Sequence, residues 1–317
     1  MINPPLVSII CLCYNHERFV AECLNAVFSQ TYPAIELIII DDYSKDNSVS
    51  VIQSMIRPQD IFIQNGHNKG ICKSFNSGLA RAKGKYVVDL AADDQLFPDT
   101  IARQVAFFET LSDEYGAIFG DAVLIDEQGK AIGSWRKRDV SGNVLSPVPQ
   151  GDVFAEVLAG TPILTVTAMT RKTVYDALEG YDETLVYEDF DFLVRASRQW
   201  KYAYSDQQWI MYRQVPGSDS RSQALRRTKH LESTFQVCAK AAVLVKTDRE
   251  REALLLRLQD GLRQCLFLEH YELAEKYVAL HQQFRPLNRK YRAIAWACQK
   301  RIPFYQVYHT FQRIRKK

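Results

Sequence analysis

The sequence lacks an apolar run of the ~20 residues that a helix needs to cross a bilayer. Its first residues, Met1 to Pro5, also lack the basic stretch and the apolar core of a signal peptide. Both absences predict a cytoplasmic protein that has no membrane-spanning segment.

The sequence also lacks cysteine spacings that are typical of disulfide bonds or zinc sites. The chain has seven cysteines, an odd number, and none of them stands in Cys-x-x-Cys spacing. This pattern indicates neither a disulfide framework nor a zinc site. Cys11 and Cys13 would share one face of a strand, where packed small side chains are a better interpretation than a metal site. We therefore expect a reducing environment.

Neither charge sign dominates, because 40 basic and 37 acidic residues leave a net charge of only +3. The basic residues gather only at the last few positions, so the broad basic patch of a nucleic-acid-binding protein is missing and no nucleic-acid partner is predicted. An apolar content of 47% with 24% charged residues is typical of a folded protein. A chain of 317 residues is long enough for one large domain and an appendage.

The first half of the chain alternates apolar strands with helical patterns. Strands are predicted at Leu6–Cys13, Ile35–Ile40 and Ile61–Gln64, with helices at Arg18–Gln30 and from Ser48 to about Met55. Near-continuous apolar strands separated by helices are typical of a parallel sheet that is buried on both faces. The fold class is therefore an open α/β fold.

The second half changes character. A strand at Ala117–Ile125, a hairpin turn at Asp126–Gly129 and a loop at Ser141–Pro149 come first. From about Arg221 onward the pattern predicts amphipathic helices only, such as Arg249–His270. We place a domain boundary near residue 220, which divides the chain into residues 1–220 and a helical region of residues 221–317.

Polar residues follow each predicted strand of the first half. Because ligands bind outside the carboxyl ends of the strands in open α/β sheets, these residues are candidates for a shared site. They are Tyr14-Asn15-His16, Asp41-Asp42, the segment Asn65–Gly70, and Asp93-Asp94.

The pair Asp93-Asp94 ends an apolar run that begins at Tyr86. Paired carboxylates there suit a divalent metal that holds a diphosphate, since hard oxygen ligands recruit Mg²⁺ or Mn²⁺. The alternative is an N-cap for a following helix. No phosphate-binding P-loop, dinucleotide fingerprint, zincin or nucleophile-elbow motif is present. A nucleotidyltransferase normally begins with a Gly-rich basic loop, which Cys11 to Arg18 does not offer.

Ordered motifs over roughly residues 6 to 220 resemble the family 2 glycosyltransferases, which are inverting enzymes of the GT-A fold. The motifs are Val7–Asn15, Leu37–Ser48, Asn68–Gly78, Ala82–Val88, Ala92-Asp93-Asp94, Gly180–Leu185, Glu188-Asp189, and Tyr212-Arg213 followed by Ser218 and Ser220. The resemblance implies a mostly parallel twisted sheet flanked by helices, with a C-terminal helical extension. It also implies transfer of a sugar from a nucleoside diphosphate, UDP in the first place, to a hydroxyl of a glycan or lipid-linked acceptor, as in bacterial surface-polysaccharide synthesis.

The resemblance assigns roles to individual residues. Asp93 and Asp94 would hold Mg²⁺ or Mn²⁺, and Asp189, preceded by Glu188, would be the general base that deprotonates the acceptor. The nucleotide-sugar site would consist of Tyr14, Asn15, Asp41, Asp42, Gly70, Asn76 and Arg213, in which a carboxylate accepts from the base or ribose and the guanidinium contacts the diphosphate.

Each role has a structural alternative. Asp41 and Asp42 could bond to their own turn, Arg213 could form a surface salt bridge, and Glu188-Asp189 could lie in the first turn of a helix.

Two departures from the family pattern stand out. Ala91 takes the place of the first carboxylate of the metal motif, and Phe75 replaces a common arginine. Asp89 lies on the same strand face as Ala91 and is either a substitute ligand or paired elsewhere. Lys73 is either a substitute cation or a solvated surface residue. These departures motivate an alternative function, a catalytically impaired GT-A domain that acts as a nucleotide-sugar-binding or scaffold protein.

The C-terminal segment Arg301–Lys317 interleaves aromatic and basic residues. Such a segment could lie on the inner face of an anionic membrane and make a peripheral contact. The alternative is a packed terminal helix with a frayed basic tail.

Overall fold

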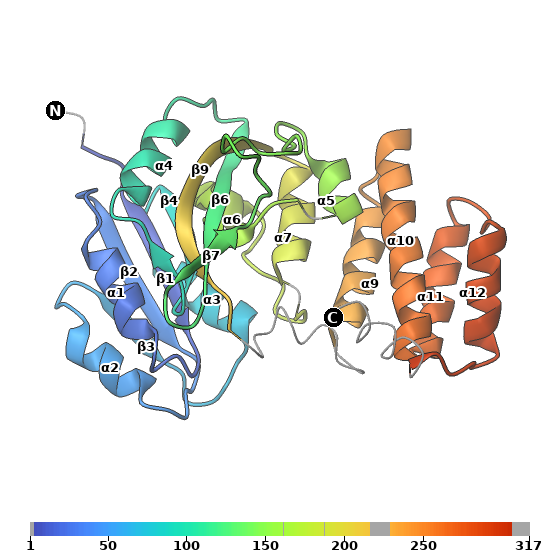
Figure 1. Cartoon of the computed structure of the whole chain (residues 1–317), viewed down its shortest axis with the longest axis horizontal. Coiled ribbons are helices and arrows are strands. Elements are labelled where there is room, and N and C mark those ends of the chain that lie inside the picture. The colour runs from blue at the N-terminus through green and yellow to red at the C-terminus, as the bar shows by residue number, and fades with distance from the viewer. Residues whose placement is uncertain (1–2, 161, 187, 216–228, 306–317) are drawn as a thin grey trace. The chain divides into compact units, whose positions relative to one another are not determined.

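The structure is a computed structural model of the chain and describes residues 3–160, 162–186, 188–215 and 229–305. The chain divides into two compact units (Figure 1). The first contains Met1–Val153, Pro162–Thr184 and Asp191–Pro216, and the second contains Phe154–Thr161, Leu185–Phe190 and Gly217–Lys317. The predicted boundary near residue 220 lies outside the described residues. The assignment of residues 1–220 to catalysis and of 221–317 to a helical region stays a prediction.

The first unit is built on one twisted sheet whose longest ladders are parallel, as the fold-class prediction states. Its strands are β1 (Val7–Cys13), β2 (Ile35–Asp41), β3 (Ile61–Gln64), β4 (Tyr86–Ala91), β5 (Gln95–Leu96), β6 (Tyr115–Ile125), β7 (Ala131–Ser134), β8 (Met169–Arg171) and β9 (Lys201–Arg213). The strand order is β3-β2-β1-β4-β8-β6-β9-β5, with β7 paired to β6. The flanking helices are α1 (Val20–Phe28), α2 (Ser48–Met55), α3 (Ile71–Leu79), α4 (Thr100–Phe108), α6 (Lys172–Ala177) and most of α7 (Glu188–Ser197).

The continuous apolar run of β1 is explained by helices on both faces of the sheet. Ile9 belongs to the core cluster that includes α1, whereas Ile10 faces α3. At Gly78 in α3, an added Cβ would lie 2.8 Å from Ile10 Cγ2 and 2.8 Å from Ile40 Cδ1. Glycine therefore lets α3 approach the sheet closely, and every β1 side chain from Val7 to Cys11 is buried.

The order in which successive strands are added to the sheet reverses at β1. Strands β2 and β3 lie on one side of β1, and β4 lies on the other, with all three neighbouring pairs parallel. Such a switch point places the carboxyl ends of two strands on either side of a crevice. The fold therefore directs the loops after β1, β2 and β4 to one edge.

The structure corrects one of the alternatives drawn from the sequence. Asp93 and Asp94 do not cap a helix, because they are followed by the short strand β5 and α4 begins only at Thr100. The 13-residue strand β9, which the sequence pattern did not reveal, pairs with β5 and β6 and ends at Arg213.

The second unit is helical. It contains α5 (Phe154–Gly160), α9 (Lys229–Ala242), α10 (Asp248–Leu268), α11 (Tyr271–Gln282) and α12 (Arg289–Gln299). Helix α10 begins with a capping box, in which Thr247 Oγ1 accepts from the Glu250 N–H and the Glu250 side chain accepts from the Thr247 N–H. In the part of the chain that the structure describes, no helix is both long and apolar enough to cross a membrane. All seven cysteines are buried thiols.

Candidate active site

The carboxyl ends of four strands are joined by backbone hydrogen bonds. The Asp42 N–H donates to the Cys13 carbonyl at 2.8 Å, and the Ala92 N–H donates to the Leu12 carbonyl at 2.9 Å. The Asn65 N–H donates to the Asp41 carbonyl at 2.9 Å. The polar segments that follow β1, β2, β3 and β4 therefore meet at one edge of the sheet.

Asn15 braces the loop after β1 against the loop after β2. Its N–H donates to Ser44 Oγ at 2.9 Å, and its Oδ1 accepts from the Lys45 N–H at 2.7 Å. Asn15 has a φ of 56°, in the left-handed region that asparagine tolerates. Its contact with the nucleotide stays a prediction. Its amide oxygen already accepts a hydrogen bond from the loop after β2.

Two tyrosines stand at the surface of this edge. Tyr14 is 45% exposed, and Tyr43 is 39% exposed with its ring under the Lys45 ammonium. Tyr43 has a φ of 70°, a conformation that is uncommon for a bulky residue and that tends to occur at functional sites. Both rings offer a flat apolar face on which a nucleobase can stack.

Asp41 and Asp42 are adjacent but have different surroundings. Asp41 is fully buried, and its Oδ1 accepts from the Ser44 N–H at 3.0 Å. Its Oδ2 is buried without a hydrogen-bond partner among the described residues. An acceptor in this state suits an incoming N–H or O–H group, since a buried acceptor left without a partner costs free energy.

Asp42 uses both carboxylate oxygens within the protein. Oδ1 accepts from Asn65 Nδ2 and from the Lys69 N–H, each at 2.8 Å, and Oδ2 accepts from the Gly70 N–H at 2.8 Å. Gly70 precedes α3 with a φ of 84°, which explains the glycine there. The carboxylate thus holds the loop that leads into α3, and the predicted nucleotide contacts of Asp42 and Gly70 stay predictions.

Replacing Asp42 by alanine should destabilise the protein more than replacing Asp41 by asparagine. Asp42→Ala leaves the Lys69 and Gly70 N–H groups without their acceptor, at about 1–3 kcal/mol each where the group stays buried, and removes one of the two acceptors of Asn65 Nδ2. Asp41→Asn keeps the oxygen that the Ser44 N–H needs. Urea denaturation of both variants measures the difference in the free energy of unfolding. Equal losses in the two variants would show that Asp42 does not organise this loop.

Asn76 forms hydrogen bonds with the backbone of a turn within the protein. Its Oδ1 accepts from the Tyr181 N–H at 2.9 Å, and its Nδ2 donates to the Tyr181 carbonyl at 2.9 Å. A Cβ at Gly180, which has a φ of 74°, would lie 2.4 Å from Asn76 Oδ1. Asn76 therefore fastens α3 to the Gly180-Tyr181 turn, and its nucleotide contact stays a prediction.

Phe75, which replaces the arginine that the resemblance implies, belongs to an aromatic cluster. It is fully buried, with its ring centroid 4.4 Å from that of Tyr181 and 5.2 Å from that of Tyr175. The Tyr181 hydroxyl donates to Asp89 Oδ2 at 2.8 Å. Asp89 is therefore paired on β4, in agreement with the structural alternative for this residue.

Asp93 and Asp94, the two carboxyls predicted to hold a metal, differ in their exposure to solvent. The Asp93 side chain is 16% exposed. Asp94 is fully buried, its Oδ1 accepts from the Arg213 N–H at 2.8 Å, and its Oδ2 has no partner among the described residues. Burial raises the pKa of the Asp94 carboxyl well above its usual range, and the negative charge of Asp93 adds to the rise.

These two carboxyls fit a divalent cation at Asp93. The described residues contain no group of three or more His, Cys, Asp or Glu side chains placed to hold a metal. A cation of the Mg²⁺ type needs only one or two carboxylates when substrate phosphates and waters supply the other oxygens. Asp93 is the accessible hard ligand of the pair.

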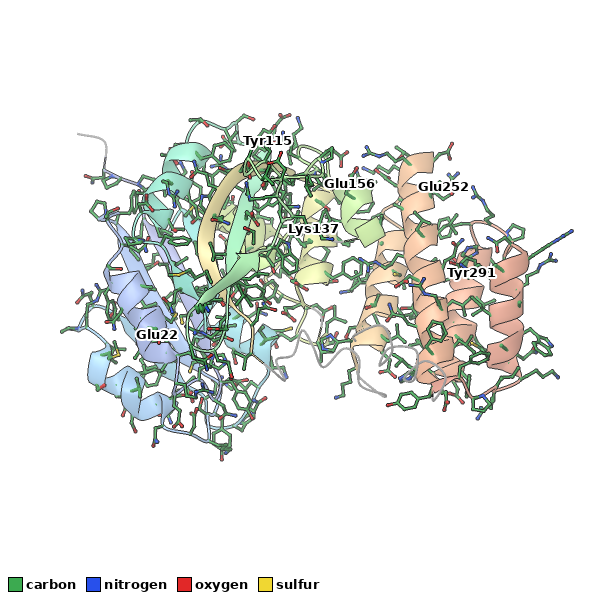
Figure 2. All side chains as sticks on the ribbon, viewed as in Figure 1. Glu22, Tyr115, Lys137, Glu156, Glu252 and Tyr291 are labelled. Carbon is green, nitrogen blue, oxygen red and sulfur yellow. The ribbon has the colours of Figure 1, made fainter. Side chains whose placement is uncertain are left out.

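Arg213 is buried instead of lying open to a ligand. Its Nε donates to the Asp93 carbonyl at 2.8 Å, and its Nη1 donates to the carbonyls of Asp126 and Glu127, each at 3.1 Å. Its Nη2 pairs at 2.6 Å with Glu22, which projects from α1 (Figure 2). Its side chain has no exposed surface. The guanidinium thus ties β9, α1 and the β6–β7 turn to Asp93, and its contact with a diphosphate stays a prediction.

His16 lies in the segment that follows β1, and the family resemblance implies no role for it. Its Nε2 lies 3.9 Å from Asp93 Oδ2. The signal in the sequence was its position directly after Tyr14-Asn15, but only the structure shows that it faces the end of β4.

Glu188 and Asp189 begin α7, as the helix alternative states. Asp189 Oδ1 accepts from the Phe190 N–H at 2.7 Å. Two residues further along, Asp191 is fully buried and pairs with Arg195 at 2.6 Å, and Arg195 also donates to the carbonyls of Leu178 and Gly180. A place in the first turn of a helix does not conflict with catalysis, so the base role of Asp189 stays a prediction.

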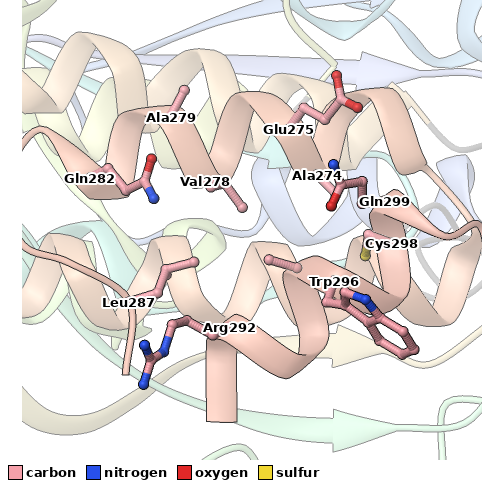
Figure 3. A pocket seen from close by; sticks show the side chains of 11 residues that line it. Ala274, Glu275, Val278, Ala279, Gln282, Leu287, Arg292, Trp296, Cys298 and Gln299 are labelled. Atoms are coloured by element: carbon pink, nitrogen blue, oxygen red, sulfur yellow. The ribbon is translucent and has the colours of Figure 1, made fainter. Parts of the chain in front are cut away.

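A cavity of about 490 Å³ in the second unit is separate from this chemistry. It lies between α11 and α12 (Figure 3). Five of its eleven lining residues are aliphatic, four are the polar residues Glu275, Gln282, Arg292 and Gln299, and none is a candidate residue of the sheet edge. Size alone does not identify it as an active site.

Comparisons with known proteins agree with this geometry. Residues 8–145 match the family model described as glycosyl transferase family 2. EpsE of Bacillus subtilis, which is named as a glycosyltransferase, is 30% identical over 226 residues, which are 69% of this chain and 76% of EpsE.

Two solved structures share the fold. TarS from S. aureus, in complex with UDP-GlcNAc, superposes with a TM-score of 0.66 at 15% identity, covering 97% of this chain and 92% of that one. The mannosyltransferase PcManGT from Pyrobaculum calidifontis, in complex with GDP-Man and Mn²⁺, gives a TM-score of 0.58 at 17% identity, covering 95% of this chain and 86% of that one.

Proposed function

The chain belongs to glycosyltransferase family 2, and from this premise we propose that it transfers a sugar, with inversion, from a nucleoside diphosphate to a hydroxyl acceptor. The observation that carries the proposal is the meeting of the β1, β2 and β4 ends. That meeting gathers a buried acceptor at Asp41, which has no partner among the described residues, and an accessible carboxylate at Asp93. The complexes of TarS with UDP-GlcNAc and of PcManGT with GDP-Man and Mn²⁺ support a nucleotide-sugar donor.

Asp41 is the residue we assign to the nucleoside. Its Oδ1 is occupied by the Ser44 N–H, so a single oxygen, Oδ2, is left for a ligand. One acceptor matches the single imide N–H of uracil, whereas guanine presents N–H groups on two neighbouring atoms. A UDP-sugar is therefore the expected donor, with Tyr14 and Tyr43 as surfaces for the base. Because Oδ2 is buried, the loop after β2 must shift slightly when the base enters.

Asp93 is the residue we assign to the divalent cation. Mg²⁺ or Mn²⁺ bound there would neutralise the charge of the diphosphate leaving group. The chain's own contribution is the fixed position of Asp93, whose carbonyl is held by Arg213 Nε at 2.8 Å. Replacement of the first motif carboxylate by Ala91 leaves one accessible carboxylate, which is sufficient when phosphate oxygens complete the coordination.

Asp189 is the residue we assign to deprotonation of the acceptor. Inversion requires the acceptor hydroxyl to attack the anomeric carbon opposite the diphosphate leaving group, so a base must accept the proton of that hydroxyl. The carboxylate takes the hydroxyl proton as the new glycosidic bond forms. The acceptor class, a glycan or a lipid-linked glycan, follows from the family premise. The proposed membrane contact of Arg301–Lys317 falls mostly on residues 306–317, which lie outside the described residues.

The proposal is tested with the wild-type protein and a panel of donors. We expect UDP, with Mn²⁺ or Mg²⁺, to raise the melting temperature more than GDP does, and one UDP-sugar to be consumed when an acceptor is supplied. A thermal-shift assay and a nucleotide-release assay measure the two effects. Binding of UDP without turnover of any donor or acceptor would favour the scaffold alternative, and no binding of any nucleotide would end the proposal.

Asp93→Ala should abolish the metal-dependent part of donor binding. The variant loses the accessible carboxylate of the pair and leaves the Arg213 anchor intact, because Arg213 Nε binds the Asp93 carbonyl. We expect a loss of at least tenfold in UDP affinity with Mn²⁺, which corresponds to about 1.4 kcal/mol, and an unchanged affinity when EDTA replaces the metal. Titration calorimetry under both conditions provides the comparison, and an equal loss with EDTA would contradict the metal role.

A further inference from the structure

His16 is held in place by a network that links the loop after β1 to the loop after β2. Its own N–H donates to Ser48 Oγ at 2.9 Å. The next residue, Glu17, is bound twice, with its N–H donating to Asp46 Oδ2 at 2.9 Å and its Oε2 accepting from the Asn47 N–H at 2.7 Å. The backbone that carries the imidazole is therefore fixed before any ligand arrives.

The ring of His16 is directed toward the end of β4. Its edge packs against Phe19 with ring centroids 6.3 Å apart, and its Nε2 lies 3.9 Å from Asp93 Oδ2. That distance is too long for a hydrogen bond. The two side chains therefore border the same space but form no hydrogen bond with each other. Both are partly exposed, at 25% for His16 and 16% for Asp93.

The burial of the other ring nitrogen determines which atom carries the proton. His16 Nδ1 is buried and has no partner among the described residues. An orphaned buried N–H is rarer in proteins than an acceptor that lacks a partner. The proton therefore belongs on Nε2, where it points toward the space beside Asp93, and the ring presents a donor there.

We propose that His16 is a further donor-binding residue, whose Nε2–H hydrogen-bonds an oxygen of the diphosphate held at Asp93. The inference rests on the proposed function, because it takes the ligand at Asp93 to be a nucleoside diphosphate. It gives this chain a second contact with the diphosphate at a site where Ala91 has removed a carboxylate and Arg213 is buried. Metal-ligating histidines normally donate their second ring N–H to an acceptor, and the isolation of Nδ1 favours the phosphate contact over direct ligation of the cation.

The test compares His16→Ala with His16→Gln, whose side-chain amide keeps an N–H donor at a similar reach. For His16→Ala we expect about a tenfold loss of UDP affinity, since a hydrogen bond to a charged group contributes at least this much. His16→Gln should recover most of the loss. Affinity for uridine, which has no phosphate, should be the same in all three proteins. Calorimetry for UDP and ligand-observed NMR for uridine provide the values.

Comparing two cations distinguishes an imidazole that donates to the diphosphate from one that ligates the metal. A histidine that ligated the metal would favour Mn²⁺ over Mg²⁺, because imidazole is a softer ligand than carboxylate. We expect the loss in His16→Ala to be equal with Mn²⁺ and with Mg²⁺. A loss confined to Mn²⁺, or unchanged UDP affinity in His16→Ala, would overturn the inference. Wild-type protein that bound no nucleoside diphosphate would instead refute the proposed function itself.

Discussion

Asp189→Asn is expected to reduce the rate of sugar transfer by about 10²–10⁴-fold, the contribution of a positioned general base. The amide cannot accept the acceptor's proton, because it lacks the basic carboxylate. It does retain an oxygen for the Phe190 N–H, which Asp189 Oδ1 accepts at 2.7 Å, so α7 should keep its first turn. Steady-state transfer assays, combined with UDP titration, should show a fall in kcat with unchanged nucleotide affinity.

Glu188→Gln is the matched control for this experiment. Glu188 is adjacent on the same helix, and its substitution makes the same change of charge. If the base is Asp189, the glutamine variant should lose far less activity than Asp189→Asn. Full activity in Asp189→Asn would refute the assignment, and a larger loss in Glu188→Gln would move the base to the neighbouring residue.

Arg213→Met is expected to lower the free energy of unfolding by about 3–5 kcal/mol, since three carbonyl groups lose their donor at about 1–3 kcal/mol each. The variant leaves three carbonyl groups and the Glu22 carboxylate without their donor. Methionine fills a similar apolar volume, so the loss reports mainly on the polar contacts. Chemical denaturation monitored by far-UV circular dichroism measures it.

The same variant discriminates between the two roles that have been assigned to Arg213. Glu22→Gln serves as the control, because it removes only the charge of one partner, which is half-exposed, and should cost less than about 1 kcal/mol. A folded Arg213→Met protein of wild-type stability with strongly reduced UDP affinity would contradict the structural role. It would support the direct diphosphate contact that the family resemblance implies.

Much of the fold followed from local patterns. The run Val7–Cys13 is apolar on both faces because helices cover both sides of the sheet, and a continuous pattern of this kind shows directly in the sequence. The strand β9 escaped prediction for the opposite reason. Its burial varies along Lys201–Arg213, from buried at Tyr202 to exposed at Asp206, so no single period dominates.

The sequence predicted that the polar strand ends would share one edge of the sheet, but not how each carboxylate there is paired. Adjacent acidic residues look equivalent in a sequence, yet Asp42 is occupied by Lys69 and Gly70 while Asp41 keeps an unpartnered oxygen. In the same way, Asp93 is accessible and Asp94 is buried beneath it. The distinction depends on which loops pack over each carboxylate, and those loops come from distant parts of the chain.

The sequence by itself determined the α/β class, the family and the positions of the polar strand ends, because strand hydrophobicity and turn residues are local properties. Only the tertiary structure decided that Arg213 is buried and that His16 faces Asp93. Arg213 meets Glu22 across 191 positions of the chain, and His16 meets Asp93 across the junction of β1 and β4. Contacts of that kind arise from the order of the strands in the sheet, which no short stretch of sequence encodes.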